Sequence, residues 1–143
     1  MAKPDPALLN PDRFPFHVDI ATRFGDLDLN KHINNVAMVG ILEDARVRFH
    51  AVSGFHIALS GFGAMVASIA VEYLGQAFHP APINVGVAAT HVGRSSYTMM
   101  QLVRQEGRIV AFAEAVMVCV GSNGPAPIPD IYRDGIGPWM LRG

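Results

Sequence analysis

The sequence predicts an α+β domain in which one antiparallel sheet of five strands is covered on one face by a single long helix. Three observations lead to this prediction. An alternating segment is followed by a polar loop, the loop is followed by one helical pattern, and the remainder reads as strands joined by turn residues. Because 143 residues are the size of one ordinary domain, we expect a single domain over residues 1–143.

The first strand is expected at Phe16–Phe24, where apolar and polar residues alternate with the period of a half-buried strand. Residues 1–15, which are interrupted by prolines, are expected to form an N-terminal extension. This start lacks the apolar stretch of a secretory signal, so we expect no export.

The next segment, Gly25–Asn34, is dense in Gly, Asp and Asn, and this composition predicts a loop. From Val36 onward the apolar residues recur at helical spacing up to Gly54. This pattern predicts a helix of about four to five turns. Asn34 or Asn35 is suited to cap its first turn.

The second half of the chain is rich in residues that favour strands. The dipeptide Glu106-Gly107 predicts a tight hairpin, and residues 121–143 predict an irregular tail whose apolar side chains can pack back on the body. The open edges of such a sheet predict a homodimer, or a homotetramer. The four expected strands are Ala64–Leu74, Ile83–Val92, Tyr97–Gln105 and Arg108–Val120.

Composition excludes several classes of partner. A formal net charge of -1, with both signs scattered along the chain, gives no footprint for nucleic acid or an anionic membrane surface. The apolar runs are too short or too interrupted to span a bilayer. The single cysteine, Cys119, lies in an apolar run and is expected in the core, which suits a reducing compartment, so we expect a cytoplasmic protein.

The loop before the helix carries the most chemistry: two carboxylates, Asp26 and Asp28, one imidazole and three carboxamides within ten residues. One interpretation is that these side chains only make turns and helix caps. The other is an acyl-transfer site. Unpaired N–H groups near Asn35 and Val36 would polarise a carbonyl at the helix start, while Asp28 activates water or attacks the carbonyl carbon.

In this second interpretation Asn30 and His32 orient the water or the carboxylate. A thioester is a suitable target because a thiolate leaves readily, so one carboxylate can suffice.

The run from Gly25 to Val36, with Leu42 and Glu43 on the helix, resembles the signature segment of the hotdog-fold thioesterases. It is most similar to that of the plant fatty acyl-carrier-protein thioesterases, and more distantly to the 4-hydroxybenzoyl-CoA thioesterase family. The resemblance implies five strands wrapped around the helix, and dimers whose active sites lie between subunits. It also implies an acyl-CoA or acyl-carrier-protein hydrolase of fatty acid metabolism.

Carried over by position, Asp28 matches the catalytic carboxylate of the 4-hydroxybenzoyl-CoA type, and Asn30 and His32 match a catalytic Asn and His of the plant enzymes. Asn35 falls where a helix-start amide polarises the thioester carbonyl, and Asp26 is interpreted as structural. The chain departs from the plant pattern at Gln76 and Ala77, where those enzymes have an acid and a cysteine.

A second candidate site is the turn Arg94-Ser95-Ser96, which is suited either to hold a phosphate or pantetheine of the carrier or to be an ordinary polar hairpin end. Arg104 and Arg108 are interpreted as solvated charges. Glu43 is a second choice of base, since its neighbours Asp44, Arg46 and Arg48 form a charged helix flank. No spacing resembles a metal site, and no cofactor is implied.

Two competing functions remain at this level. A non-hydrolysing acyl-CoA-binding protein of the same fold is suggested by Gln76 and Ala77. A dehydratase of the same fold would also use a His and a carboxylate near the helix start, but the Asp-Leu-Asp-Leu-Asn segment argues against it.

Overall fold

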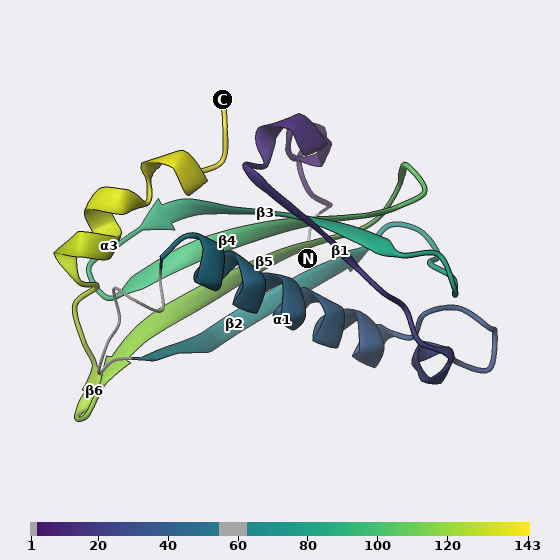
Figure 1. Cartoon of the computed structure of the whole chain (residues 1–143), viewed down its shortest axis with the longest axis horizontal. Coiled ribbons are helices and arrows are strands. Elements are labelled where there is room, and N and C mark those ends of the chain that lie inside the picture. The colour runs from purple at the N-terminus through teal and green to yellow at the C-terminus, as the bar shows by residue number, and fades with distance from the viewer. Residues whose placement is uncertain (1–2, 55–62) are drawn as a thin grey trace.

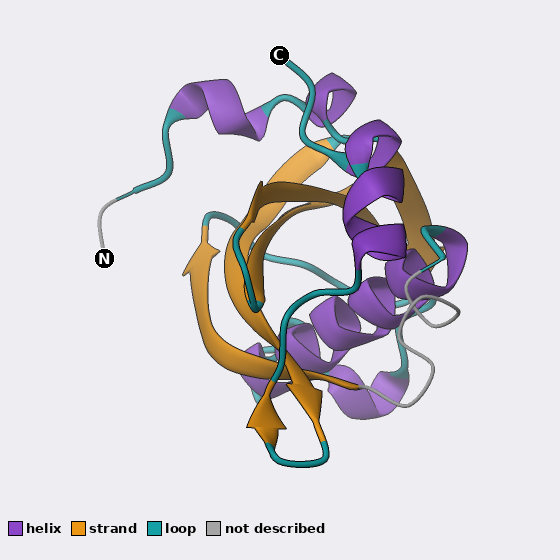
Figure 2. Ribbon diagram, turned by 90° about the vertical axis from the view of Figure 1, so that its left-hand side faces the viewer, coloured by secondary structure: helices purple, strands orange, loops and turns teal. Residues whose placement is uncertain are grey.

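A computed structural model describes residues 3–54 and 63–143 and confirms the α+β hotdog prediction. The curled antiparallel sheet has the order β1-β3-β4-β5-β2, and helix α1 (Asn35–Val52) lies along its concave face (Figures 1 and 2). The five strands are β1 (Phe16–Ile20), β2 (Gly63–Tyr73), β3 (Ile83–Val92), β4 (Ser96–Gln105) and β5 (Arg108–Gly121).

The main core lies between α1 and the sheet. Met38, Leu42, Ala45 and Phe49 recur every three or four residues along the helix and are buried against inward-facing strand residues. Asn34 accepts the N–H of Ala37 at 2.7 Å and so caps the first turn, one of the two predicted caps. Within the described residues, no helix is long and apolar enough to cross a membrane.

The tight hairpin predicted between β4 and β5 is confirmed. Glu106 and Gly107 have φ values of 51° and 78°, so both central residues adopt the left-handed conformation that a two-residue hairpin turn requires. Gln105 and Arg108 therefore face each other across the strand pair, and their side chains lie on the same side of the sheet.

The predicted first strand, Phe16–Phe24, is too long, because β1 ends at Ile20. The chain leaves the sheet there, since the Thr22 hydroxyl is hydrogen-bonded to His79 at 3.0 Å. A short 3-10 turn at Phe24–Asp26 follows, closed by the Asp26 carboxylate. Alternation alone did not reveal where strand pairing stops.

The segment before β1 packs on the convex face of the sheet, on the side opposite α1 (Figure 2). Phe14 is buried there, in a second small core. Gly86 of β3 makes room for it, because a Cβ at this position would lie 3.1 Å from the Cβ of Phe14 and 3.0 Å from the ring of His17.

Gly86→Ala is expected to lower the free energy of unfolding by about 1–3 kcal/mol through overpacking. Gly40→Ala is the matched control: Gly40 lies in α1 with open space where a Cβ would be, so this change is expected to stabilise the protein by up to about 1 kcal/mol. Urea denaturation of both variants checks the pair. Equal stability of Gly86→Ala and wild type would show that Phe14 does not pack on this glycine.

The tail, expected to be irregular, is partly ordered into elements. It contains the two-residue strand β6 (Gly124–Pro125), the short helix α3 (Asp130–Gly135) and a 3-10 turn at Gly137–Trp139. Tyr132 is 2% exposed and Trp139 packs on Phe49 with ring centroids 5.9 Å apart, so the predicted packing of the tail on the body is confirmed for these side chains.

Candidate active site at the start of helix α1

The Asp28 loop is a turn that closes on itself. The N–H of Asp28 donates to the carbonyl of His32 at 2.9 Å, and the N–H of Lys31 donates to the carbonyl of Asp28 at 3.0 Å. Lys31 takes a left-handed conformation with φ of 62°, and Leu27 pairs with Ile33 at the base of the turn. The loop therefore presents Asp28 from a fixed backbone.

The Asp28 carboxylate is held by main-chain donors. Its Oδ1 accepts the N–H of Asn30 at 2.8 Å and the N–H of His32 at 3.2 Å. Oδ2 has no hydrogen bond to any described residue. Asp28 is exposed, so Oδ2 can contact water or a substrate. Asn30 and His32 thus orient the carboxylate through their backbone, and their side chains make no hydrogen bond to it.

Asp26 has a different environment from Asp28. It is 4% exposed and accepts hydrogen bonds from the Arg23 backbone at 2.9 Å and from the Arg23 guanidinium at 2.9 Å and 3.2 Å. Its carbonyl accepts the N–H of Asn34 at 2.8 Å, which links the loop to the helix cap. The interpretation of Asp26 as structural is confirmed.

The first N–H groups of α1 are available as donors. The N–H groups of Asn35 and Val36 make no hydrogen bond to any described residue, whereas Ala37 donates to the cap and Met38 donates to the carbonyl of Asn34. They sit at the positive end of an 18-residue helix. A carbonyl oxygen placed here would be polarised, and a developing oxyanion would be stabilised.

Asp28 and Asn35 line one pocket of about 460 Å³. Tyr73, at the end of β2, belongs to its wall and donates its hydroxyl to the carbonyl of Asn35 at 3.2 Å. The other lining residues are Ile33, Met38, Leu74, Gly75, Gln76 and Ala77. Asp28 and Asn35, two of the site residues predicted from the sequence, therefore line one pocket together with Gln76, whereas Val36 does not line it.

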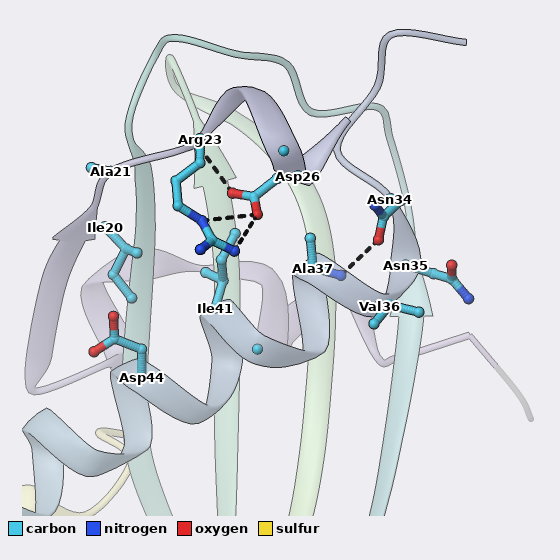
Figure 3. A pocket seen from close by; sticks show the side chains of 12 residues that line it. Ile20, Ala21, Arg23, Asp26, Asn34, Asn35, Val36, Ala37, Ile41 and Asp44 are labelled. Carbon is cyan, nitrogen blue, oxygen red and sulfur yellow. Dashed lines mark hydrogen bonds and ion pairs between the residues drawn. The ribbon is translucent and has the colours of Figure 1, made fainter. Parts of the chain in front are cut away.

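A larger pocket of about 660 Å³ flanks the other side of the helix start (Figure 3). It is lined by Ile20 at the end of β1, by Arg23 and Asp26 from the loop, and by helix residues that include Asn35, Val36, Gly40 and Asp44. Its two acids are both paired with arginines, Asp26 with Arg23 and Asp44 with Arg48. The smaller pocket differs in that its acid, Asp28, forms no ion pair with a described residue.

The turn Arg94-Ser95-Ser96 lies at the opposite end of α1 from Asp28 in the same chain, next to α3 (Figure 1). The helix between the two ends is about 27 Å long. The backbone of the turn is held by Arg133, which donates to the carbonyls of Gly93 at 2.7 Å and Arg94 at 3.2 Å. The structure does not bring Arg94 and Asp28 together within one chain.

Gln105 supports the pocket wall and was not singled out from the sequence. Its fully buried side chain accepts the N–H of Phe78 at 2.8 Å and donates to the carbonyls of Phe78 at 2.7 Å and Ala81 at 2.9 Å. The adjacent Ala77 carbonyl accepts the N–H of Ile33 at 2.8 Å, which ties this wall to the Asp28 loop. The only sequence signal was an amide at an inward position of a strand.

The interpretation of Arg46 as part of a charged helix flank is wrong. Arg46 is 4% exposed and donates to Gln101 at 3.0 Å, while Gln101 donates to the carbonyl of Leu42 at 2.9 Å. Burial lowers the pKa of Arg46. Asp44 and Arg48 do form the exposed pair expected of a flank, at 2.8 Å.

Gln101→Leu is expected to lower the free energy of unfolding by about 2–4 kcal/mol, because it leaves the Arg46 guanidinium buried without its partner. Gln101→Glu, which keeps an acceptor for Arg46, is expected to lose clearly less. Thermal and urea unfolding of the two variants check this. An equal loss in both would mean that packing, rather than the hydrogen bond, sets the cost.

Comparisons with known proteins show the family and the fold. The family model of the thioesterase-like superfamily matches residues 22–139. A thioesterase from Thermus thermophilus, solved in complex with coenzyme A and Zn, is 33% identical, with a TM-score of 0.78 over 87% of this chain and 94% of that chain. No curated protein matches the chain.

Two further solved structures share the fold at lower identity. A predicted thioesterase from Bacillus stearothermophilus is 22% identical, with a TM-score of 0.80 over 90% of this chain and 98% of that chain. A 1,4-dihydroxy-2-naphthoyl-CoA thioesterase from Synechocystis is 14% identical, with a TM-score of 0.74 over 85% of this chain and 94% of that chain. The chain belongs to the thioesterase-like superfamily and is an enzyme that hydrolyses thioesters.

Proposed function

We propose that the protein hydrolyses the thioester of an acyl-CoA or of an acyl carrier protein, with Asp28 as the catalytic carboxylate. The observation that supports this most directly is the shared pocket of Asp28 and Asn35, in which a carboxylate and a helix-start residue whose N–H has no described partner border the same space. Asp28 acts as a general base on water or as the nucleophile itself.

In the base mechanism, Asp28 takes a proton from water as the oxygen of that water bonds to the carbonyl carbon. The N–H groups of Asn35 and Val36 stabilise the resulting oxyanion. The C–S bond then breaks, the thiolate leaves and is protonated, and the carboxylic acid is released. Asn30 and His32 orient the attacking water in this proposal. No bound cofactor is required.

The second part of the proposal concerns the carrier of the acyl group. The coenzyme A bound to the Thermus thermophilus thioesterase supports acyl-CoA as substrate. The resemblance of the Asp28 loop to the plant enzymes supports an acyl carrier protein and a place in fatty acid metabolism. Since Gln76 stands in the pocket wall where those enzymes have an acid, we assign hydrolysis to Asp28 without that second acid.

We infer that the working unit is a homodimer, or a tetramer built from it, in the cytoplasm. Among the described strands, β2 lies at one edge of the sheet and pairs only with β5, and it is exposed near its start, where Met65 is 61% and Val66 is 42% exposed. On the face of α1 that points away from the core, Val36 is 77% and Val47 is 52% exposed. A second copy would cover both surfaces and bring another chain beside the pocket.

In such a dimer the Arg94-Ser95-Ser96 turn would have to serve the pocket of the other copy, since the length of α1 separates it from its own Asp28. On this basis we propose that Arg94, Ser95 and Ser96 bind the carrier in the pocket of the other copy.

Release of free thiol from a panel of short, long and aromatic acyl-CoAs, read with a thiol reagent, tests the proposed function. Turnover of at least one substrate is expected. Acyl-CoA binding by calorimetry without release of thiol would instead support a non-hydrolysing binding protein.

A further inference from the structure

Two cations are not used by the hydrolytic mechanism, one bonded to the wall of the Asp28 pocket and one in the Asp28 loop. Arg108, at the start of β5, donates to the carbonyl of Gln76 at 3.2 Å, and Gln76 lines the pocket. Lys31 is exposed in the Asp28 loop, three residues after the carboxylate. Neither cation is within ion-pair distance of a described carboxylate, unlike Arg23 and Arg48.

Arg108 is held in place although it is exposed. Its guanidinium carbon lies 5.7 Å from the centroid of the Phe78 ring, and on that ring the His32 imidazole packs edge-on at 5.1 Å. His32 belongs to the Asp28 loop, so the contacts run without a break from Asp28's own turn to Arg108. The Gln105 side chain holds the backbone of Phe78 through hydrogen bonds to its N–H and its carbonyl. The cation is thus preorganised, and apart from its bond to the carbonyl of Gln76 it donates to no residue that the structure describes.

A pantetheine thioester has its reactive sulfur at one end of the arm and a phosphate at the other. The phosphate cannot be desolvated inside the pocket without a large cost, so it must lie at the rim when the thioester is inside. Guanidinium groups match phosphate oxygens with two parallel hydrogen bonds. The sequence-based interpretation of Arg108 as a solvated charge overlooked this position.

We propose that Arg108, assisted by Lys31, binds the phosphate at the end of the pantetheine arm, a group that coenzyme A and acyl carrier proteins share. This rests on the proposed function, because the arm must run from Asp28 outward. It assigns the phosphate to the same chain that supplies Asp28, whereas Arg94 lies at the other end of α1.

Steady-state kinetics with one acyl group on three carriers tests the proposal: coenzyme A, 4′-phosphopantetheine, and pantetheine, which lacks the phosphate. Arg108→Ala is expected to raise KM about tenfold for the first two, with kcat unchanged, and to leave pantetheine thioesters unaffected. Arg108→Lys should recover part of the loss, and Lys31→Ala should show a smaller rise. Arg48→Ala, which removes an exposed but paired arginine, should change nothing.

Three results would overturn the proposal. An equal effect of Arg108→Ala on all three carriers would mean that Arg108 acts by positioning the pocket wall. An effect on coenzyme A alone would assign it to the nucleotide part of that carrier. A KM effect in Arg94→Ala, with none in Arg108→Ala, would assign phosphate binding to the Arg94-Ser95-Ser96 turn instead.

Calorimetry with free coenzyme A separates this inference from the proposed function. If the wild type hydrolyses none of the three thioesters, the proposed function fails on its own. Weaker binding of coenzyme A by Arg108→Ala than by wild type would still support the phosphate site, and equal binding would refute it.

Discussion

Asp28→Asn is expected to lower kcat for thioester hydrolysis by about 10²- to 10⁴-fold, because the amide can neither take a proton from water nor attack the carbonyl carbon. The substitution keeps the side-chain volume and one oxygen to accept the N–H groups of Asn30 and His32. The loop should therefore keep its turn. Substrate KM should change little, since the carboxylate acts in the chemical step.

Asp26→Asn is the matched control in the same Asp-Leu-Asp segment. Asp26 is buried and bound to Arg23, so its loss is expected to reduce stability by about 1–3 kcal/mol and to leave kcat near wild type below the unfolding temperature. Asp28→Asn should thus lower kcat, whereas Asp26→Asn should lower the free energy of unfolding. Equal loss of kcat in both variants would show that the loop's shape, rather than the Asp28 carboxylate, limits the reaction.

Asn35→Pro is expected to lower kcat by about 10²- to 10³-fold by removing one helix-start N–H from the oxyanion site. Position 35 is the first residue of α1, where proline is well tolerated, and Asn34 has φ of -76° and ψ of 162°, a conformation that suits a residue before proline. The carbonyl of residue 35, which accepts the Tyr73 hydroxyl, is kept.

Asn35→Ala is the control for the side chain, because it keeps the N–H and removes only the carboxamide. We expect Asn35→Ala to retain most of the activity while Asn35→Pro does not, with circular dichroism and urea unfolding showing both variants folded. If the alanine variant lost as much activity as the proline variant, the carboxamide would be the functional group and the backbone donor would not.

The local patterns of this sequence were sufficient for the fold class and for the loop that carries Asp28. Strand alternation, one helical period and the Glu106-Gly107 turn each depend on residues close in the chain, and each was confirmed. The end of β1 was not predicted, because the chain after it is held by a hydrogen bond between Thr22 and His79, a residue of a loop distant in sequence. The same holds for Gln105 and Arg46, whose importance comes from burial by other elements.

The site was predictable in part for the same reason. Asp28 and the helix start are neighbours in sequence, so the loop alone placed them together. The wall formed by Tyr73 and Gln76 comes from the far end of β2 and required the sheet order to be known. Arg108 reaches this wall only because the hairpin after β4 turns it back toward Gln76. No residue spacing in the sequence predicts that contact.

The most direct test of the central claim is to measure thiol release and acyl-CoA binding in parallel, for wild type and for Asp28→Asn. We predict that both proteins bind the acyl-CoA with similar affinity and that only the wild type releases thiol at an appreciable rate. Equal thiol release by the two proteins would contradict the assignment of hydrolysis to Asp28.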